Sequence, residues 1–375
     1  MRETNCRMWV LAAGLLGLAM GCPPALAAGT LEIGATAPDF SLPGVDDKTY
    51  TLESFREAEA LVIIFTCNHC PTSQAYEDRI KQLAADYKDK KVAIVAISPN
   101  DPEAVRPDEL GYSDLGDSLA DMKIRAKDKA FNFPYLYDGE DQKASRAYGP
   151  VATPHVFIFD KARKLRYAGR IDSSEKPDKA ATRETRDAIE AVLAGRAVLV
   201  ETTKAFGCST KWSDKRASAR KWLEDCAKEP VDLKPIDEPA VRALAKNDGQ
   251  KTRLIAVWAA DAGPSVEALS ELVTVNRMYR RRNFEMVTLA ADAPGAKDKV
   301  LEVLKARQAS ATNFLFDGGD KEKLLKAVDE KAGGGALPHV ILVAPGGEVL
   351  YRKAGDIDPL ALKKAIVACV GRTYK

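Results

Sequence analysis

The chain has 375 residues, of which 46% are hydrophobic and 29% are charged, as in ordinary soluble globular proteins. Its 56 basic and 54 acidic residues leave a net charge of +2, so the charge balance gives no reason to expect a nucleic acid or a membrane surface as a partner. At about 150 residues per domain, the length suggests two domains.

The first 28 residues are predicted to be an export signal. Arg2 and Arg7 accompany an apolar stretch that is too short for a membrane span, and residues 25–28 offer a cleavage site of the A-x-A type. An alternative is a lipoprotein signal with Cys22 as the lipidated residue, although Ala19 stands where a larger aliphatic residue is usual. Both alternatives place the mature protein in the periplasm or cell envelope, without an integral membrane segment after signal removal.

The next elements form one α/β unit. In chain order we predict a buried strand at 60–65, a helix at 73–87, a strand at 92–97, a hairpin-like pair of strands around a turn at 161–164, and a helix at about 179–194. Strand, helix, strand argues for a βαβ unit with parallel pairing. Residues 99–125 form a long insertion that we expect to cover the functional site of this unit.

The second half of the chain repeats this order. The predicted elements are a strand at 254–258, a helix at 265–280, a strand at 284–290, a turn at 345–348 and a helix at 359–370. Three segments of the first unit are echoed in the second: 133–141 by 313–320, 154–160 by 338–344, and 169–172 by 355–358. The sequence therefore predicts an α/β fold with two tandem domains, residues 29–229 and 240–375, each a mixed central sheet flanked by helices. The Pro-rich residues 230–239 are the predicted linker.

Cys67, Asn68, His69 and Cys70 form a C-x-x-C motif between the first buried strand and its helix. That position favours a thiol–disulfide motif over half of a zinc site, which would need two more thiolate or imidazole ligands at short spacing. The sequence has no second C-x-x-C. We therefore expect no bound metal and no cofactor; a metal site and an inert cysteine pair remain the alternatives.

The motif also suggests a role for each cysteine. We expect Cys67 to cap the helix N-terminus, where unpaired N–H groups and the helix dipole stabilise a thiolate. A protonated His69 would add positive charge, and a stabilised reduced form makes the disulfide a stronger oxidant. Cys70 lies one turn along the helix and is predicted to resolve a mixed disulfide formed on Cys67.

Several motifs resemble those of the thioredoxin-like superfamily, specifically the peroxiredoxin-like redoxins of the alkyl hydroperoxide reductase/thiol-specific antioxidant type. The resemblance extends from Ile33 to about Trp212 and is carried by residues 34–42, 65–71, 75–80, 97–101, 133–138, 153–154, 169–172 and 207–212. It implies a thioredoxin-like fold in which Thr153 and Pro154 form the cis-proline loop facing the dithiol. There the Thr153 backbone would bind substrate, and Pro154 would keep metals and bulky side chains away from the sulfurs.

The second unit is similar to a thioredoxin that has lost its cysteines. Residues 258–265 resemble the thioredoxin stretch Trp-x-x-x-Cys-Gly-Pro-Cys, but Ala262 and Ser265 occupy the two cysteine positions. Leu337 and Pro338 keep the loop that would face this vacant site. We expect this domain to be redox-silent, with client binding, partner binding and a scaffold role left open.

Two departures bear on the activity that the resemblance implies. Leu61 stands where thioredoxins carry a buried acid, so proton transfer needs another group or water. Ile64 stands where a peroxiredoxin carries the Thr ahead of its peroxidatic cysteine. We therefore predict an exported thiol–disulfide oxidoreductase that acts on protein thiols and disulfides and works with a redox partner. The alternatives are a thiol peroxidase and a non-enzymatic protein that binds metal or client proteins.

Three cysteines remain outside the motif and the signal region. Cys208 could form a structural disulfide with Cys226, relay a disulfide to or from Cys67, or stay unpaired. Cys369 lies in an apolar helical pattern, which favours a buried and inert thiol.

Overall fold

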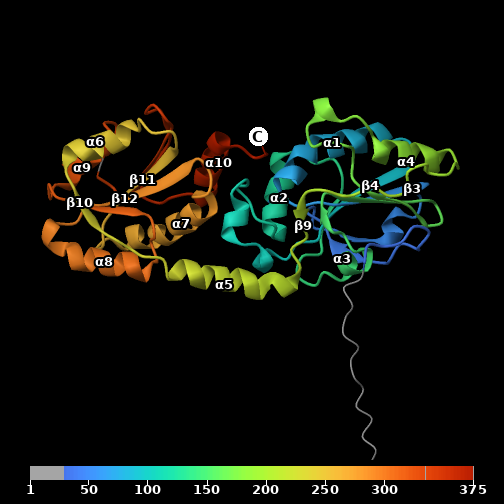
Figure 1. Cartoon of the computed structure of the whole chain (residues 1–375), viewed down its shortest axis with the longest axis horizontal. Helices are drawn as coiled ribbons and strands as arrows, with labels where there is room; N and C mark the ends of the chain where they lie inside the picture. Colours follow the sequence, from blue (N-terminus) through green and yellow to red (C-terminus); the bar gives the residue numbers. More distant parts are fainter. Residues whose placement is uncertain (1–28, 334, 375) are drawn as a thin grey trace, which may run out of the picture.

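The computed structural model describes residues 29–333 and 335–374, so the predicted export signal lies outside the described residues. Across these ranges no helix is both long and apolar enough to cross a membrane. Figure 1 shows two α/β bodies side by side, joined along one side by α5 (Arg216–Ala227). The two mixed sheets with flanking helices confirm the predicted fold class.

The first domain is built on a five-stranded mixed sheet. Its strands, in spatial order, are β5 (Tyr135–Tyr137), β4 (Val92–Ser98), β3 (Ala60–Phe65), β7 (His155–Phe159) and β8 (Leu165–Gly169). The strands β3, β4 and β5 run parallel, and β7 is antiparallel to both β3 and β8. The helices of this domain are α1 (Pro71–Tyr87), α2 (Leu119–Asp128), α3 (Lys143–Tyr148) and α4 (Glu184–Leu193).

The central strand β3 is buried on both faces. Because side chains alternate along a strand, Val62 and Ile64 face the core under α1 and α4, whereas Leu61 and Ile63 face the core that includes α3. An unbroken apolar run suits a strand that is covered on both faces. This burial holds the end of β3, and the loop that follows it, in a fixed position.

Short elements complete the first domain. They are β1 (Ser41–Pro43) paired with β2 (Thr49–Thr51), β6 (Ala152–Thr153) paired with β9 (Cys208–Ser209), and the 3-10 helices η1 (Leu52–Phe55), η2 (Pro102–Ala104), η3 (Pro107–Leu110), η4 (Pro177–Lys179) and η5 (Ser213–Lys215). The β6–β9 pair lies beside the dithiol and is central to the site described below.

The second domain has a six-stranded sheet of the same kind. Its strands, in spatial order, are β10 (Lys234–Ile236), β13 (Thr312–Phe316), β12 (Phe284–Ala290), β11 (Thr252–Trp258), β14 (His339–Val343) and β15 (Val349–Ala354). Its helices are α6 (Glu238–Lys246), α7 (Gly263–Tyr279), η6 (Pro294–Ala296), α8 (Lys297–Ala306), α9 (Lys321–Val328) and α10 (Pro359–Val370). The order of a parallel βαβ unit followed by an antiparallel pair matches the first domain.

The predicted linker differs from the structure. Residues 230–239 contain the edge strand β10 and the start of α6, so the second domain begins inside this stretch. Prolines are tolerated in an edge strand because one side of that strand needs no ladder hydrogen bonds. The connection between the sheets is instead made by α5 (Figure 1).

The insertion at 99–125 joins the two domains. Tyr279 in α7 donates its hydroxyl to the Ser113 carbonyl at 2.7 Å. Arg282 donates to the Gly111 carbonyl at 2.6 Å. The second domain is therefore anchored on the same segment that lies over the dithiol.

Candidate active site

The dithiol lies where β3 ends and α1 begins. Cys70 is the N-cap of α1, and its sulfur accepts a hydrogen bond from the Ser73 N–H at 3.4 Å. The prediction that Cys67 caps this helix was wrong. Pro71 explains the difference, because proline lacks an N–H and its fixed φ suits the first helical position, so the helix starts directly after Cys70.

The Cys70 sulfur is the better stabilised of the two. It accepts a second backbone hydrogen bond, from the Cys208 N–H at 3.3 Å, and when protonated it donates to the Thr153 carbonyl at 3.2 Å. Burial alone would raise the pKa of Cys70, but its hydrogen bonds with neighbouring thiols and the charge of His69 hold that pKa well below its usual range. In this arrangement the second cysteine of the motif has the better stabilised thiolate.

The surroundings of Cys67, in contrast, disfavour its thiolate. Its sulfur lies 3.2 Å from Thr153 Oγ1 and 3.6 Å from His69 Nδ1. Burial, together with the nearby Cys70 and the Asp117 carboxylate, raises the pKa of Cys67. Only 3% of Cys67 and none of Cys70 is exposed, so the dithiol is closed to a protein substrate in this arrangement.

His69 is held by a carboxylate that the sequence analysis did not identify. Its Nδ1 lies 2.6 Å from Asp117 Oδ2, where the ring N–H donates to the carboxylate. Burial lowers the pKa of His69, but the charge and hydrogen bond of Asp117 outweigh it and raise that pKa overall. Burial would likewise raise the pKa of Asp117, and His69 and Asn100 lower it overall. Both shifts favour the charged form of this pair, an imidazolium and a carboxylate, which is buried beside the two sulfurs.

Asp117 and Asn100 both belong to the insertion at 99–125, and Asn100 follows shortly after the end of β4. The insertion was expected to cover the site, and it does, but no local motif marks Asp117 among its several carboxylates. Asn68 secures the insertion in turn, because its side-chain amide donates to the Gly116 carbonyl at 2.8 Å. A carboxylate thus reaches the surroundings of the dithiol from another part of the chain and not from the strand position of Leu61.

The loop predicted to face the dithiol does so. The Thr153–Pro154 and Leu337–Pro338 peptide bonds are both cis. In β6, however, Thr153 is already paired in antiparallel register with Cys208 of β9. The chain itself therefore occupies the backbone edge at which the resemblance places a substrate.

The other cysteines do not form the predicted structural pair. Cys208 and Cys226 are both free thiols, and Cys226 is buried where it accepts a hydrogen bond from Arg280 Nη2 at 3.4 Å. Cys369 was predicted to be buried but is exposed. The buried stripe of α10 contains Ile366, Val367 and Val370, and Cys369 falls on the other side of the helix.

Three groups at the site have the chemistry of metal ligands. The ligand atoms of Cys67, His69 and Asp117 lie within 4.8 Å of one another. His69 Nδ1 and Asp117 Oδ2 already share a hydrogen bond, which a metal ion would have to displace. The geometry as it stands therefore fits a charged pair next to a thiol better than a coordination site.

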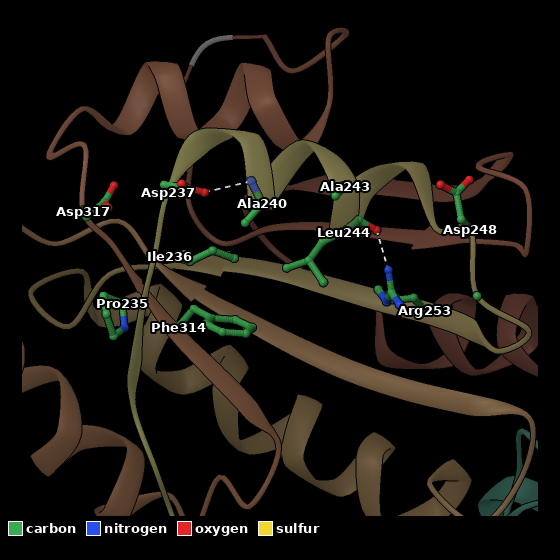
Figure 2. A pocket seen from close by; sticks show the side chains of 11 residues that line it. Pro235, Ile236, Asp237, Ala240, Ala243, Leu244, Asp248, Arg253, Phe314 and Asp317 are labelled. Carbon is green, nitrogen blue, oxygen red and sulfur yellow. Dashed lines mark hydrogen bonds between the residues drawn. The ribbon is translucent and has the colours of Figure 1, made fainter.

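A broad hollow in the second domain lies away from this chemistry. It opens between α6 and the strands β10 and β13, and neither cysteine nor histidine lines it (Figure 2). Arg253 in this hollow donates to the Leu244 carbonyl at 2.7 Å, and Asp237 accepts from the Ala240 N–H at 2.9 Å. Because these polar groups serve the fold, the dithiol remains the candidate site.

A C-x-x-C dithiol between a buried strand and a helix, facing a cis-proline loop, is the arrangement of a thioredoxin-like redoxin. Residues 33–168, all within this domain, match the AhpC/TSA family. The first domain is thus a thioredoxin-like redoxin of the AhpC/TSA family.

Individual relatives cover the same half of the chain. Alkyl hydroperoxide reductase E of Mycobacterium tuberculosis (strain ATCC 25618 / H37Rv) is 27% identical over 172 residues, which are 44% of this chain and 99% of that protein. An uncharacterized conserved protein from Geobacillus kaustophilus is 36% identical, with 51% of this chain and 97% of that chain covered and a TM-score of 0.44. A hypothetical protein from Sinorhizobium meliloti 1021 is 31% identical, with 50% and 97% covered and a TM-score of 0.44.

Proposed function

We propose that this chain is an exported thiol–disulfide oxidoreductase that acts on protein thiols and disulfides through Cys67 and Cys70, with a separate protein as its redox partner. The observation that supports this most is the contrast between the two sulfurs. Cys70 accepts two backbone N–H groups, whereas Cys67 lies beside the cis-proline loop without them. A stabilised thiolate next to a second thiol is the arrangement that disulfide exchange requires.

In the reducing direction, Cys67 loses its proton and attacks one sulfur of the substrate disulfide. A mixed disulfide forms, and the first substrate thiolate leaves and takes up that proton. The Cys70 thiolate then attacks Cys67 Sγ, which breaks the mixed disulfide and expels the second substrate thiolate. Two electrons pass from the dithiol to the substrate, and the protein is left with a Cys67–Cys70 disulfide; the oxidising direction is the reverse.

The test is disulfide exchange by the mature protein with a model protein substrate. We expect Cys67→Ser to abolish exchange and Cys70→Ser to trap the mixed disulfide. Cys369→Ser, which changes an exposed thiol outside the site, is the matched control and should exchange at the wild-type rate. Exchange that is unchanged in Cys67→Ser would sink the proposal.

The reduction potential tests the direction of electron flow. A stabilised Cys70 thiolate and a protonated His69 both favour the reduced form, which makes the disulfide more oxidising. We therefore expect a potential nearer to about −120 mV than to about −270 mV in a glutathione titration read by alkylation. A value at the lower end would mark the protein as a reductant instead.

Thiol peroxidase activity is the second candidate, and the match to the AhpC/TSA family favours it. Against it, Ile64 is fully buried at the position of the peroxide-polarising Thr. Peroxide consumption that is rapid in the wild type and lost in Cys67→Ser would establish this activity.

Export to the periplasm or cell envelope is proposed from residues 1–28 of the sequence. Fractionation of cells that express the full chain tests it, and replacement of Cys22 by Ser distinguishes lipidation from simple cleavage. Retention of the full-length chain in the cytoplasm would contradict export.

A further inference from the structure

The strand β9 places a third thiol against the dithiol. Its two residues pair in antiparallel register with β6, so Cys208 lies opposite Thr153. Thr153 also contacts the motif itself, since its Oγ1 lies 3.2 Å from Cys67 Sγ and its carbonyl lies 3.2 Å from Cys70 Sγ. One residue of the cis-proline loop therefore touches all three cysteines.

Cys208 also contacts Cys70 directly through its backbone. The Cys208 N–H donates to Cys70 Sγ at 3.3 Å. The two thiols also affect each other's pKa: Cys208 contributes to the lowered pKa of Cys70, and Cys70 to the raised pKa of Cys208. A residue 138 positions along the chain thus places a third cysteine beside Cys70.

The chain around Cys208 is built for this approach. Gly207 has a φ of +137°, and a Cβ at this position would lie 2.0 Å from the Thr153 carbonyl oxygen, so only glycine fits there. After Cys208, the Thr210 hydroxyl donates to the Pro150 carbonyl at 2.8 Å, and the Lys211 N–H donates to Asn100 Oδ1 at 2.8 Å. These contacts hold residues 207–211 in place beside the dithiol.

We propose that Cys208 is a third redox cysteine, which takes over the disulfide of the motif by exchange with Cys70. This rests on the proposed function, because the Cys67–Cys70 disulfide is the starting species. The Cys208 thiolate attacks Cys70 Sγ, the Cys70–Cys208 bond forms, and the Cys67–Cys70 bond breaks. Cys67 leaves as a thiolate and takes the proton lost by Cys208. No electrons are gained or lost, so no further oxidant is needed.

As a consequence, Cys208 serves as a substrate thiol that belongs to the protein itself. With β9 seated on β6 and Cys208 linked to Cys70, Cys67 is free as a thiol while the protein as a whole stays oxidised. An external protein thiol must displace β9 or react with the Cys70–Cys208 disulfide. The oxidised protein therefore exists as two disulfide isomers, one with the Cys67–Cys70 bond and one with the Cys70–Cys208 bond.

The experiment is disulfide mapping of the mature protein after equilibration with oxidised glutathione, followed by alkylation and peptide analysis. We expect Cys67→Ser to yield a peptide pair linked through Cys70 and Cys208. In the wild type we expect part of the oxidised protein to carry an alkylated Cys67, and this fraction should vanish in Cys208→Ala. Cys226→Ser is the matched control and should map like the wild type.

The outcomes separate this inference from the proposed function. A reversible Cys67–Cys70 couple in the wild type, with only glutathione adducts on Cys70 in Cys67→Ser, overturns the role of Cys208 and leaves the oxidoreductase standing. A Cys70–Cys208 pair without any Cys67–Cys70 couple sinks the proposed function and, with it, the exchange by which Cys208 takes over the disulfide of the motif. If Cys67→Ser fails to fold, the role of Cys208 is tested by one comparison: the extent of Cys67 alkylation in the oxidised wild type against that in oxidised Cys208→Ala.

Discussion

At the scale of single residues, the buried pair of His69 and Asp117 sets the charge beside the dithiol. Asp117 accepts four hydrogen bonds: from the backbone N–H groups of Asn68 and His69, from His69 Nδ1 and from the Asn100 side chain. Such bonds are what a buried ion pair needs to offset the cost of leaving water. The pair therefore keeps a positive charge next to the sulfurs without exposing them.

Replacement of Asp117 by Asn removes the group that raises the pKa of His69. His69 then loses its proton at a lower pH, and the pKa of Cys70 rises because the imidazolium no longer favours its thiolate. We expect the pH profile of Cys70 alkylation in the reduced protein to move to higher pH. Asp121→Asn, in the same insertion but bonded to Ser118, is the matched control. An unmoved profile would contradict this role of Asp117.

The same pair makes stability depend on pH. The folded pKa of His69 lies above its usual value of 6.5, so its contribution is complete below pH 6.5 and is lost as pH rises through the folded pKa. The folded pKa of Asp117 lies below 3.8, so its contribution is complete above pH 3.8 and is lost as pH falls through the folded pKa. We expect Asp117→Asn to cost about 3–5 kcal/mol between these limits.

Urea unfolding across this pH range checks the prediction. The difference in unfolding free energy between the wild type and Asp117→Asn should shrink at both ends of the range. A difference that is the same at every pH would show that the substitution disturbs packing and not a charged pair.

At the scale of elements, the short strand β9 controls access to the cis-proline loop. It is only two residues long, and it depends on the close approach that Gly207 permits. A strand of this length has few ladder hydrogen bonds of its own, so its neighbours determine whether it stays in place.

Replacement of Gly207 by Ala should release β9 from β6. The new Cβ would overlap the Thr153 carbonyl, and the positive φ adds strain of about 1–3 kcal/mol. We expect lower stability and faster alkylation of Cys208 in the reduced protein. Gly195→Ala is the matched control, because Gly195 also has a positive φ but no atom within 4 Å of its Cβ position. Equal effects on Cys208 in both variants would refute the close-approach argument.

At the scale of the whole molecule, the second domain closes the site of the first. After α10 the chain returns to the first domain, where Arg372 forms two contacts with Asp114 at 2.6 and 2.9 Å. Tyr374 packs on Tyr112 with ring centroids 5.1 Å apart, and burial together with the neighbouring Cys208 raises the pKa of Tyr374. The second domain thus supplies a terminal segment that reaches the surroundings of the third thiol.

Replacement of Arg372 by Ala should loosen this terminal segment. Because the buried Asp114 loses its closer arginine and keeps Arg125 at 3.7 Å, we expect lower stability as well as faster alkylation of Cys208. Lys364→Ala is the matched control, since it removes a different ion pair between the domains, with Asp128, away from the dithiol. If both variants left the alkylation rate of Cys208 unchanged, the segment after α10 would not be what shields this thiol.

The sequence by itself determined the local features of this protein. Strand β3 follows from an apolar run, and helix α10 lies where the sequence predicted the last helix, at about residues 359–370. The repeats indicated two related domains, and C-x-x-C located the dithiol. These features depend on residues that are close together in the sequence, so their propensities and periodicity can be recognised without the structure. Cys369 shows the limit of such patterns, because membership of an apolar segment does not decide which face of the helix a residue occupies.

Only the tertiary structure decided which groups surround the two sulfurs. Asp117 is 48 positions from His69 and Cys208 is 138 positions from Cys70, and no local pattern links either pair. The fold of the insertion places Asp117 beside His69, and the pairing of β6 with β9 places Cys208 beside Cys70. Hydrogen bonds and charges act through space, so the reactivity of a cysteine depends on distant segments that meet only after the chain has folded.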